Sequence, residues 1–423
     1  MSCYNDDELT PPAWIEEEFL QDVLSQYEGK PVAEIIKFEL SPASMKGDHY
    51  STVMLRCKVE YKLDQLPKQA KQKSLIIKTI PSEEGMKRDL LLQSRVFENE
   101  ISMYTKTLPK IEKILEQFGE PTKLSAGIVY HSLEPHKVII LEDLCELGYT
   151  AIRGRFLHEH ELKATYTKLA KIHAVTYMLG LSEDHHLVTN YQDGFMSKKS
   201  PIFTEILNNG LRNFIDLLLS HKELNIYVDN IQVMQQEVEQ ACNDMFNAYS
   251  LNKGQSDDIL VLNHGDFHIK NLMFKFNEAN EMEDMIMVDF QGSCYAPSNL
   301  DMQYSQFLLL SPEMRTKRHE ILHFYFTEFI RILKKINYQG KLPKYSQFQM
   351  SALKYRHFTL CLLAVLYPMV VPFFYKSAED LKDANTNEMI ENPEVVALNY
   401  KLPCYVEEIH KLMPILLYEG YLD

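Results

Sequence analysis

One motif in the second half of the chain has the residue types and spacing needed for phosphoryl transfer. It reads His264-Gly265-Asp266-Phe-His-Ile-Lys-Asn271. This chemistry requires a base beside the acceptor hydroxyl and oxygen ligands for the Mg²⁺ that accompanies ATP. Asp266 can accept the hydroxyl proton, and Asn271 can offer its amide oxygen to the metal. If each residue type occurs at about 5%, four fixed residues in this pattern arise by chance in a few chains per thousand of this length.

A second acidic loop follows the first along the chain. The apolar run Met285-Ile-Met-Val288 leads into Asp289-Phe290-Gln291. Asp289 would bring a full negative charge that bridges Mg²⁺ to the phosphates. The alternative is a pair of turns in which Asp266 and Asn271 only cap backbone amides. The presence of Asp289 at the end of the next apolar run favours the chemical interpretation.

A lysine and a glutamate upstream can complete the phosphate site. Lys78 lies in Leu75-Ile-Ile-Lys78, a predicted strand of the kind that bears a phosphate-binding lysine. Glu100 lies in the next predicted helix, where its carboxylate can pair with Lys78. Glu98 and Asp89 are its rivals, and Glu98 is predicted to face solvent. Glu100 is preferred because it shares one helix face with two aromatic residues, Phe97 and Tyr104.

Three further residues are assigned supporting roles. Gly47 is the only glycine in the segment 44–50. That segment is either a loop that covers the phosphates or a plain hairpin turn, and both interpretations stay open. His264 is interpreted as a residue that braces its loop by bonding to backbone rather than as a base. Asp301 is expected to hold the backbone of the same loop from behind.

The elements that must position these residues follow from hydrophobic periodicity. Val53, Leu55, Cys57, Val59 and Tyr61 alternate with polar residues, which is typical of a half-buried strand. The predicted order is three strands, a helix, two strands and a long helical half. We therefore predict an N-terminal helical extension at residues 1–30, a nucleotide-binding sheet and helix at 31–145, and a helical unit with the catalytic loop and acceptor pocket at 146–423.

Composition excludes several classes of function. The chain has 423 residues, a formal net charge of -15 and ordinary globular hydrophobicity at 45%, so nucleic acid and anionic lipid are poor partners. Its seven cysteines form no CxxC pair, and the acidic N-terminus lacks an apolar signal core, which together indicate a cytoplasmic protein. The apolar stretch Phe358–Tyr375 is interrupted by Pro368 and Pro372. We expect a buried helix that ends near Tyr367, without membrane insertion.

These motifs also resemble a known family. His-Gly-Asp-x₄-Asn is similar to the motif of the aminoglycoside phosphotransferase and choline kinase group. The resemblance narrows to the insect ecdysteroid kinase-like family, with its CHK kinase-like domain, through several further motifs. They are Lys46-Gly-Asp-His-Tyr50, Phe97-x-x-Glu-x-x-x-Tyr104, Ile139-Ile-Leu-Glu-Asp-Leu144, Leu169-Ala-x-x-His-Ala174, Asn271-Leu-Met-Phe274, Val288-Asp-Phe-Gln291 and Leu300-Asp-Met302.

The resemblance extends from about Trp14 to the C-terminal helices, with one local departure. Phe267 and His268 stand where that family often has Leu-Trp. This departure concerns local contacts with the substrate rather than the catalytic residues.

The resemblance implies an α+β, bilobal, protein-kinase-like fold. It has a small antiparallel-sheet N-lobe with one key helix and a large, mostly helical C-lobe. The implied activity is transfer of phosphate from ATP, with Mg²⁺, to a hydroxyl of an ecdysteroid or another apolar alcohol or xenobiotic. The backbone of Glu142-Asp143-Leu144 would meet the adenine. A small-molecule alcohol is then the expected partner, and no obligate protein partner is evident.

Two alternatives stay open. One is a choline- or aminoglycoside-type kinase for a cationic acceptor, and the other is a non-catalytic pseudokinase that binds a lipophilic ligand. Aromatic residues in the C-terminal half either line an apolar acceptor pocket or form the core, and the core is favoured. They include Phe324, Phe326, Phe348, Phe358 and Tyr367.

Overall fold

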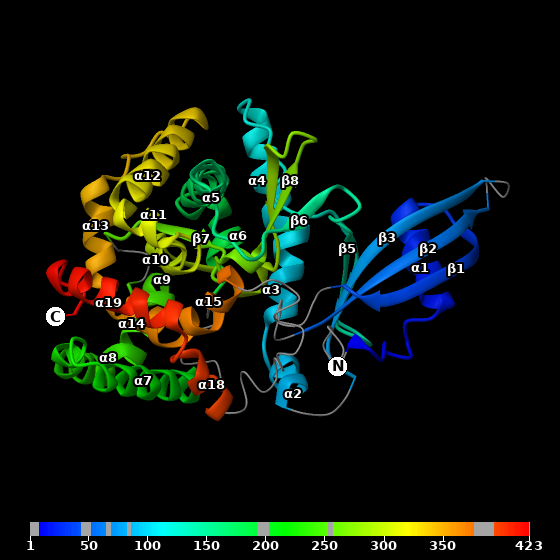
Figure 1. Cartoon of the computed structure of the whole chain (residues 1–423). Helices are drawn as coiled ribbons and strands as arrows, with labels where there is room; N and C mark the ends of the chain where they lie inside the picture. Colours follow the sequence, from blue (N-terminus) through cyan, green and yellow to red (C-terminus); the bar gives the residue numbers. More distant parts are fainter. Residues whose placement is uncertain are drawn as a thin grey trace.

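The computed structural model describes residues 8–43, 52–64, 69–82, 86–192, 203–252, 257–375 and 393–422. Within these ranges the chain forms an N-terminal antiparallel sheet followed by a mostly helical remainder (Figure 1). This confirms the predicted α+β, bilobal, protein-kinase-like fold. Gly47, the candidate phosphate-loop glycine, lies outside the described residues.

The sheet has five antiparallel strands in the order β1-β2-β3-β5-β4. Alternation along β2 agrees with the prediction, because its odd-numbered residues from Val53 to Leu63 are all buried and the residues between them are not. The register places Lys78 of β3 opposite Met54 of β2 and Ile139 of β5. The five strands are β1 (Val32–Pro42), β2 (Val53–Leu63), β3 (Ala70–Thr79), β4 (Ile128–Ser132) and β5 (Val138–Glu142).

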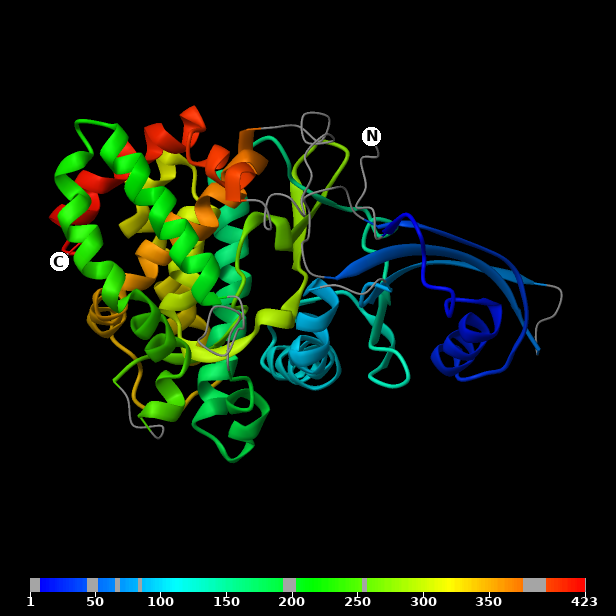
Figure 2. The same ribbon diagram turned by 90° about the horizontal axis from the view of Figure 1, so that it is seen from below.

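The first helix, α1 (Glu17–Glu28), covers one face of this sheet (Figure 2). Leu20, Val23 and Leu24 are its buried residues, and they join the buried side of β1 to β5 in one hydrophobic cluster. The helix ends at Gly29, which adopts φ 63°, a conformation that only glycine takes at little cost. This helix is thus part of the core of the sheet.

The opposite face of the sheet meets the helices that follow β3. They are α2 (Met86–Gln93), α3 (Val96–Ser102) and α4 (Leu108–Gln117), with a π-helical turn at Met103–Thr107 between the last two. In both views α3 and α4 lie between the sheet and the helical remainder (Figures 1 and 2). Their buried side chains belong to the large hydrophobic cluster of the helical part, not to the cluster of the sheet and α1.

Two small sheets within the helical part position the catalytic loop and the second acidic loop. The strands β6 (Tyr149–Ala151), β8 (Leu272–Phe276) and β9 (Met282–Met287) form one sheet, and β7 (Leu260–Asn263) pairs with β10 (Cys294–Pro297). The surrounding helices are α5 (Glu159–Gly180), α6 (His186–Thr189), α7 (Phe203–Ser220), α8 (Val228–Phe246), α9 (Ala248–Leu251), α10 (Asn299–Leu308), α11 (Pro312–Thr316), α12 (Arg318–Lys335), α13 (Tyr345–Lys354), α14 (Arg356–Cys361), α15 (Tyr367–Tyr375), α18 (Pro393–Asn399) and α19 (Pro403–Tyr418).

The apolar stretch near the C-terminus is a helix, but it does not end near Tyr367 as predicted. It runs from α14 through a π-helical turn into α15 and is helical as far as Tyr375, the last residue described in this part of the chain. A proline removes one backbone N–H and crowds the carbonyl four residues earlier. Here the carbonyl of Ala364, four residues before Pro368, accepts a hydrogen bond from the hydroxyl of Tyr400 instead. The distant tyrosine and the wider turn let the helix continue.

This helix is also the one described segment long and apolar enough to cross a membrane. In the structure 83% of its most apolar window is buried inside the protein, which is the position of a core helix. The aromatic residues that were candidates for an acceptor pocket mostly lie in the same core. Those with exposures of 7% or less are Phe326, Phe348, Phe358 and Tyr367.

Candidate active site

The catalytic loop connects β7 to β8 and brings Asp266 and Asn271 together. The Nδ2 of Asn271 donates to the backbone oxygen of Asp266 at 2.9 Å and to its Oδ2 at 3.1 Å. On the other side, Nε2 of His268 lies 3.2 Å from Oδ1. The Asp266 side chain keeps 26% of its surface exposed. A hydroxyl group can therefore reach the carboxylate from the solvent side.

Asp266 is held in its ionised form, as a base must be. Burial alone would raise the pKa of this carboxyl, but His268, His264 and the hydrogen bond from Asn271 lower the pKa below its ordinary value. A carboxylate of this kind stays charged at neutral pH. It can orient an acceptor hydroxyl and take its proton as the bond to phosphorus forms.

The glycine of the catalytic loop is required by close packing. Gly265 adopts φ +80°, and a Cβ atom there would lie 1.9 Å from the backbone oxygen of Gly292. Gly292 follows the second acidic loop, so the two loops touch backbone to backbone at this point. A side chain at position 265 would therefore force the backbones of the two loops apart.

The second acidic loop contains a strained aspartate. Asp289 has φ 65° and ψ 63°, the left-handed conformation that non-glycine residues rarely adopt. This turn aims its Oδ1 at Nζ of Lys78, 2.7 Å away, while Nε2 of Gln291 lies 3.3 Å from Oδ2. The side chain of Asp289 is 22% exposed. It thus lies at the boundary between the sheet and the helical part.

Lys78 and Glu100 form a buried ion pair. Nζ of Lys78 lies 2.6 Å from Oε2 of Glu100, and the two side chains are 4% and 2% exposed. Burial alone would lower the pKa of Lys78, but the charges of Asp289 and Glu100 raise its pKa well above the usual value. Burial raises the pKa of Glu100, and the charge of Lys78 opposes that rise. One ammonium group therefore satisfies two carboxylates at this point.

The π-helical turn that follows α3 helps to position Glu100 against the second acidic loop. The ring of Tyr104 packs edge-on against Phe290 with centroids 5.7 Å apart, and the backbone of Phe290 bonds to Glu100. Glu98 points elsewhere: its Oε1 lies 3.1 Å from Nζ of Lys137, and its side chain is 31% exposed. The expectation that Glu98 faces solvent is thus only partly correct, since Lys137 partners it.

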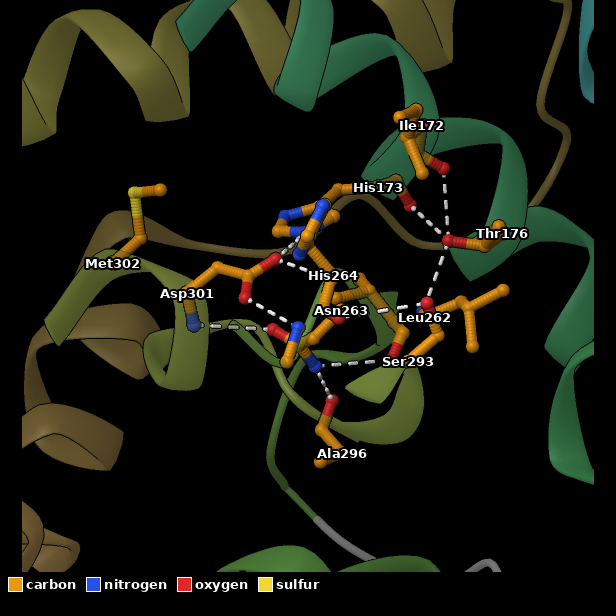
Figure 3. A network of polar contacts seen from close by, with 12 residues as sticks. Ile172, His173, Thr176, Leu262, Asn263, His264, Ser293, Ala296, Asp301 and Met302 are labelled. Atoms are coloured by element: carbon orange, nitrogen blue, oxygen red, sulfur yellow. Dashed lines mark hydrogen bonds and ion pairs between the residues drawn. The ribbon is translucent and has the colours of Figure 1, made fainter. Parts of the chain in front are cut away.

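The carboxylate of Asp301 holds the catalytic loop from behind (Figure 3). Its two oxygens accept the backbone N–H groups of His264 at 2.7 Å and Gly265 at 3.0 Å. Nε2 of His173, on α5, lies 3.2 Å from the same carboxylate, and Nδ1 of that ring lies 2.7 Å from the hydroxyl of Tyr325. Asp301 and His173 are fully buried. This network fixes the loop without reaching the reacting atoms.

His264 and Asn263 extend the same network to neighbouring backbone. Nε2 of His264 lies 3.0 Å from the backbone oxygen of Val288, directly before Asp289. Asn263 donates to the backbone oxygen of Ala296 at 3.0 Å (Figure 3). His264 therefore ties the two acidic loops together, and its contacts are those of a brace.

In the segment that links the sheet to the helical part, the sequence indicates a role for the backbone of Asp143 but none for its side chain. Asp143 is buried, and it accepts Nε of Arg56 at 2.6 Å and the hydroxyl of Ser74 at 2.7 Å. Its neighbour Glu142 accepts the N–H of Gly127 at 3.1 Å, and Leu144 is buried. Asp143 thus anchors this segment to β2 and β3. The family motif Ile139-Ile-Leu-Glu-Asp-Leu144, which contains Asp143, is the sequence signal that could have pointed to this role.

The donor set fits a hard divalent cation bound together with a nucleotide. Both hydrogen bonds of Asn271 leave from Nδ2, so Oδ1 is the side-chain atom left to act as a ligand, and Asp289 supplies a carboxylate. Among the described residues no group of three or more His, Cys, Asp or Glu side chains forms a metal cluster. Two oxygen ligands plus phosphates match Mg²⁺ in phosphotransferases, which keeps waters and substrate oxygens in its shell.

Comparison with known proteins agrees with this geometry. The sequence pattern of the ecdysteroid kinase-like family matches residues 46–338. The chain belongs to the ecdysteroid kinase-like family. Membership places it among the kinase-like phosphotransferases, and the matched residues include all of the candidate site residues named above. A search of curated proteins found no match.

Solved structures with a related chain course are aminoglycoside phosphotransferases. The ADP-bound APH(2'')-Ib is 12% identical, with 92% of this chain and 98% of that chain covered and a TM-score of 0.34. The streptomycin–ATP complex of APH(2")-IIa is 13% identical, with 85% and 97% covered and a TM-score of 0.32. These values describe a distant likeness, so they supply nothing about the substrate.

Proposed function

We propose that this protein is an ATP- and Mg²⁺-dependent kinase that phosphorylates a hydroxyl group of an ecdysteroid or a similar apolar alcohol. The observation that supports the proposal most is that five polar side chains from distant parts of the chain form two groups beside touching loops. Lys78 bonds Glu100 and Asp289, and Asn271 bonds Asp266. The backbone N–H of Val288, next to Asp289, donates to the backbone oxygen of Asn271 at 3.0 Å and so joins the two loops. The reaction converts ATP and R–OH into ADP and R–O-phosphate.

Each side chain has a role in this proposal. Asp266 orients the acceptor hydroxyl and receives its proton, and Lys78, held by Glu100, binds the ATP phosphates. Asn271 and Asp289 would hold Mg²⁺, which neutralises charge on the phosphates when it is bound. In this structure Lys78 donates to Asp289. With ATP bound, Lys78 would contact the phosphates and Asp289 would contact the metal, in place of this direct bond.

The nucleoside end of ATP is assigned to the segment anchored by Asp143. Glu142 is the last residue of β5, which lies between β3 and β4 in the sheet, and Asp143 and Leu144 follow it directly. Backbone N–H and C=O groups can bond an adenine ring there, and the Arg56–Asp143–Ser74 contacts would keep that backbone in place. We also propose the division at residues 1–30, 31–145 and 146–423 as the domain plan. The face on which α1 and the sheet share one cluster ties the first two parts together.

Membership of the ecdysteroid kinase-like family is the reason for proposing an apolar acceptor. The proposal does not rest on an apolar pocket in the structure. The aromatic residues Phe348, Phe358 and Tyr367 lie in the core and are not offered as pocket residues. We also propose a cytoplasmic location, with which the cysteines of the described ranges accord because none of them forms a disulfide bond. No nucleic acid, membrane or obligate protein partner enters the proposal.

The decisive experiment incubates the full chain with γ-labelled ATP, Mg²⁺ and a mixture of ecdysteroids, plant and microbial alcohols, choline and aminoglycosides. Mass spectrometry then identifies every compound that gains a phosphoryl group. Asp266→Asn is the control that should lose the products. A phosphorylated ecdysteroid or apolar alcohol is expected. Products from choline or aminoglycosides alone would assign a cationic acceptor, and nucleotide binding without any product would point to a non-catalytic binding protein.

A further inference from the structure

His268 is a polar residue in an otherwise apolar part of the catalytic loop. Its neighbours Phe267 and Ile269 are fully buried, and its own side chain is only 13% exposed. Nε2 lies 3.2 Å from Oδ1 of Asp266. The second ring nitrogen, Nδ1, is buried and makes no hydrogen bond with any residue that the structure describes. Within the described ranges, Asp266 is therefore the side chain that offers the His268 ring a hydrogen-bond partner.

With this contact, both carboxylate oxygens of Asp266 have a neighbouring side-chain N–H group. Asn271 donates to Oδ2 of Asp266, and His268 approaches Oδ1. A carboxylate has about four lone-pair sites, so two donors leave room for the acceptor hydroxyl. Two donors on opposite oxygens also restrict rotation of the carboxylate about its last bond. A base that is already oriented loses less entropy in the transition state than one that turns freely.

We propose that His268 is a positioning residue for phosphoryl transfer: its Nε2–H donates to Oδ1 of Asp266 and sets the direction in which the base faces the acceptor hydroxyl. The inference rests on the proposed kinase function. It requires the tautomer or charge form with a proton on Nε2, because a carboxylate can only accept. A purely space-filling side chain at this position would need no such proton.

Two variants separate the hydrogen bond from the volume of the ring. His268→Leu keeps an apolar side chain but removes the donor, and His268→Gln keeps an amide N–H that reaches about as far as Nε2. We expect His268→Leu to lower kcat about ten- to a hundredfold, because a hydrogen bond to a charged group is lost. The KM for ATP should change by less than about twofold, and His268→Gln should recover most of the lost kcat.

The exposed His160, at the start of α5, provides a matched control. His160→Leu should leave kcat and KM as they are in the parent protein. The proposal is overturned if His268→Leu has no more effect than His160→Leu, or if His268→Gln is as slow as His268→Leu. A parallel loss of kcat and thermal stability, equal in both His268 variants, would show a packing role instead.

A second measurement does not depend on turnover or on the folding of the His268 variants. Nuclear magnetic resonance of the full chain with ¹⁵N-labelled histidine reports which ring nitrogen of His268 bears the proton. A proton on Nε2, with a resonance that shifts in Asp266→Ala, is expected. A neutral ring protonated at Nδ1 overturns the proposal. If the parent transfers no phosphoryl group to any acceptor while this proton is found on Nε2, the kinase function fails and the contact stands.

Discussion

The two hydrophobic clusters of the molecule contribute unequally to the site. The cluster formed by α1 and one face of the sheet includes the buried residues Leu75 and Ile77, which lie in β3 just before Lys78. In the larger cluster, buried residues stand directly beside each of the other candidate side chains. These neighbours are Ile101 beside Glu100, Phe267 beside Asp266, Leu272 beside Asn271 and Phe290 beside Asp289.

This difference indicates that the larger cluster fixes Glu100, Asp266, Asn271 and Asp289 relative to one another. Lys78, in contrast, extends toward Glu100 and Asp289 from a strand of the sheet. The bonds from Lys78 to Glu100 and Asp289 therefore join the two regions. Changes within the larger region should abolish chemistry, changes at this joint should impair use of ATP, and changes far from the joint should affect stability. The following predictions test that order.

The largest effect is expected at Asp289, which belongs to both the joint and the proposed metal site. Asp289→Asn removes a full charge from the place where Lys78 and Mg²⁺ would be held. We expect Mg²⁺–ATP binding to weaken strongly and turnover to fall below detection, because the metal can no longer neutralise the phosphates. Calorimetric titration with Mg²⁺–ATP measures the binding. Binding as tight as in the parent would remove Asp289 from the metal site.

Asp266→Asn should have the next largest effect, and it should be confined to chemistry. The amide keeps the shape of the side chain but cannot accept the proton. A loss on the order of 10²–10⁴ in kcat is expected, with ATP affinity largely retained. Single-turnover kinetics beside nucleotide titration checks both parts. Near-normal turnover would contradict the assignment of Asp266 as the base.

Much of the fold around the candidate site could be predicted from local sequence patterns. The strand order, the helix that bears Glu100 and the two acidic loops follow from periodicity and from short motifs. Contacts between distant residues were not predictable in the same way. The polar run from Lys62 to Lys73 by itself predicts a loop, yet β2 extends to Leu63 and β3 begins at Ala70. The charged residues of early β3 find partners on α1: Lys71 bonds Glu28 at 2.6 Å, and Lys73 lies over the ring of Tyr27.

Other details of the site depend on the folded backbone. The left-handed conformation of Asp289 and the close approach of Gly265 to Gly292 appear only when the two loops meet. The anchoring role of the Asp143 side chain was not predictable because its partners, Arg56 and Ser74, lie on two other strands. In each case the physical cause is a contact between segments far apart in the sequence, which no local pattern encodes.

The joint itself can be tested with two glutamates on one helix. Glu100→Gln removes the charge that holds Lys78 in a buried pair, and kcat/KM for ATP should fall about ten- to a hundredfold, as expected for a lost charge-assisted hydrogen bond. Glu98→Gln removes only the half-exposed contact with Lys137, which is worth about 0–1 kcal/mol in such settings. It should change kcat/KM by less than about twofold. Equal losses in the two variants would show that Glu100 does not have the special position assigned to it.

The smallest effect is expected where the helix α4 is anchored to the larger region. Just after α4, Glu120 lies 3.2 Å from Nζ of Lys171 on α5 and 2.8 Å from a guanidinium nitrogen of Arg331 on α12. Nearby, Nζ of Lys168 bonds the backbone oxygen of Lys123 at 2.8 Å. These contacts attach α4, which follows α3 through the π-helical turn at Met103–Thr107, to the helical part rather than to the sheet. They should therefore influence stability without changing the use of ATP.

Glu120→Gln should lower the free energy of unfolding by about 0.5–1 kcal/mol at neutral pH, because its ion pairs are partly screened by solvent. Burial opposes the shift, but Arg331 and Lys171 lower the pKa of Glu120 below its ordinary value of 4.5 in the folded protein. A carboxylate with a lowered pKa stabilises the fold above 4.5 and loses that contribution as the pH falls through the lowered value. The difference between parent and variant in urea unfolding should thus be constant above about pH 4.5 and narrow below it. Glu116→Gln, at an exposed position of α4, is the matched control and should show no such difference. A large fall in kcat/KM for ATP in Glu120→Gln would mean that this anchor also sets the position of Glu100, and the separation between the two regions would then be less complete than their cores indicate.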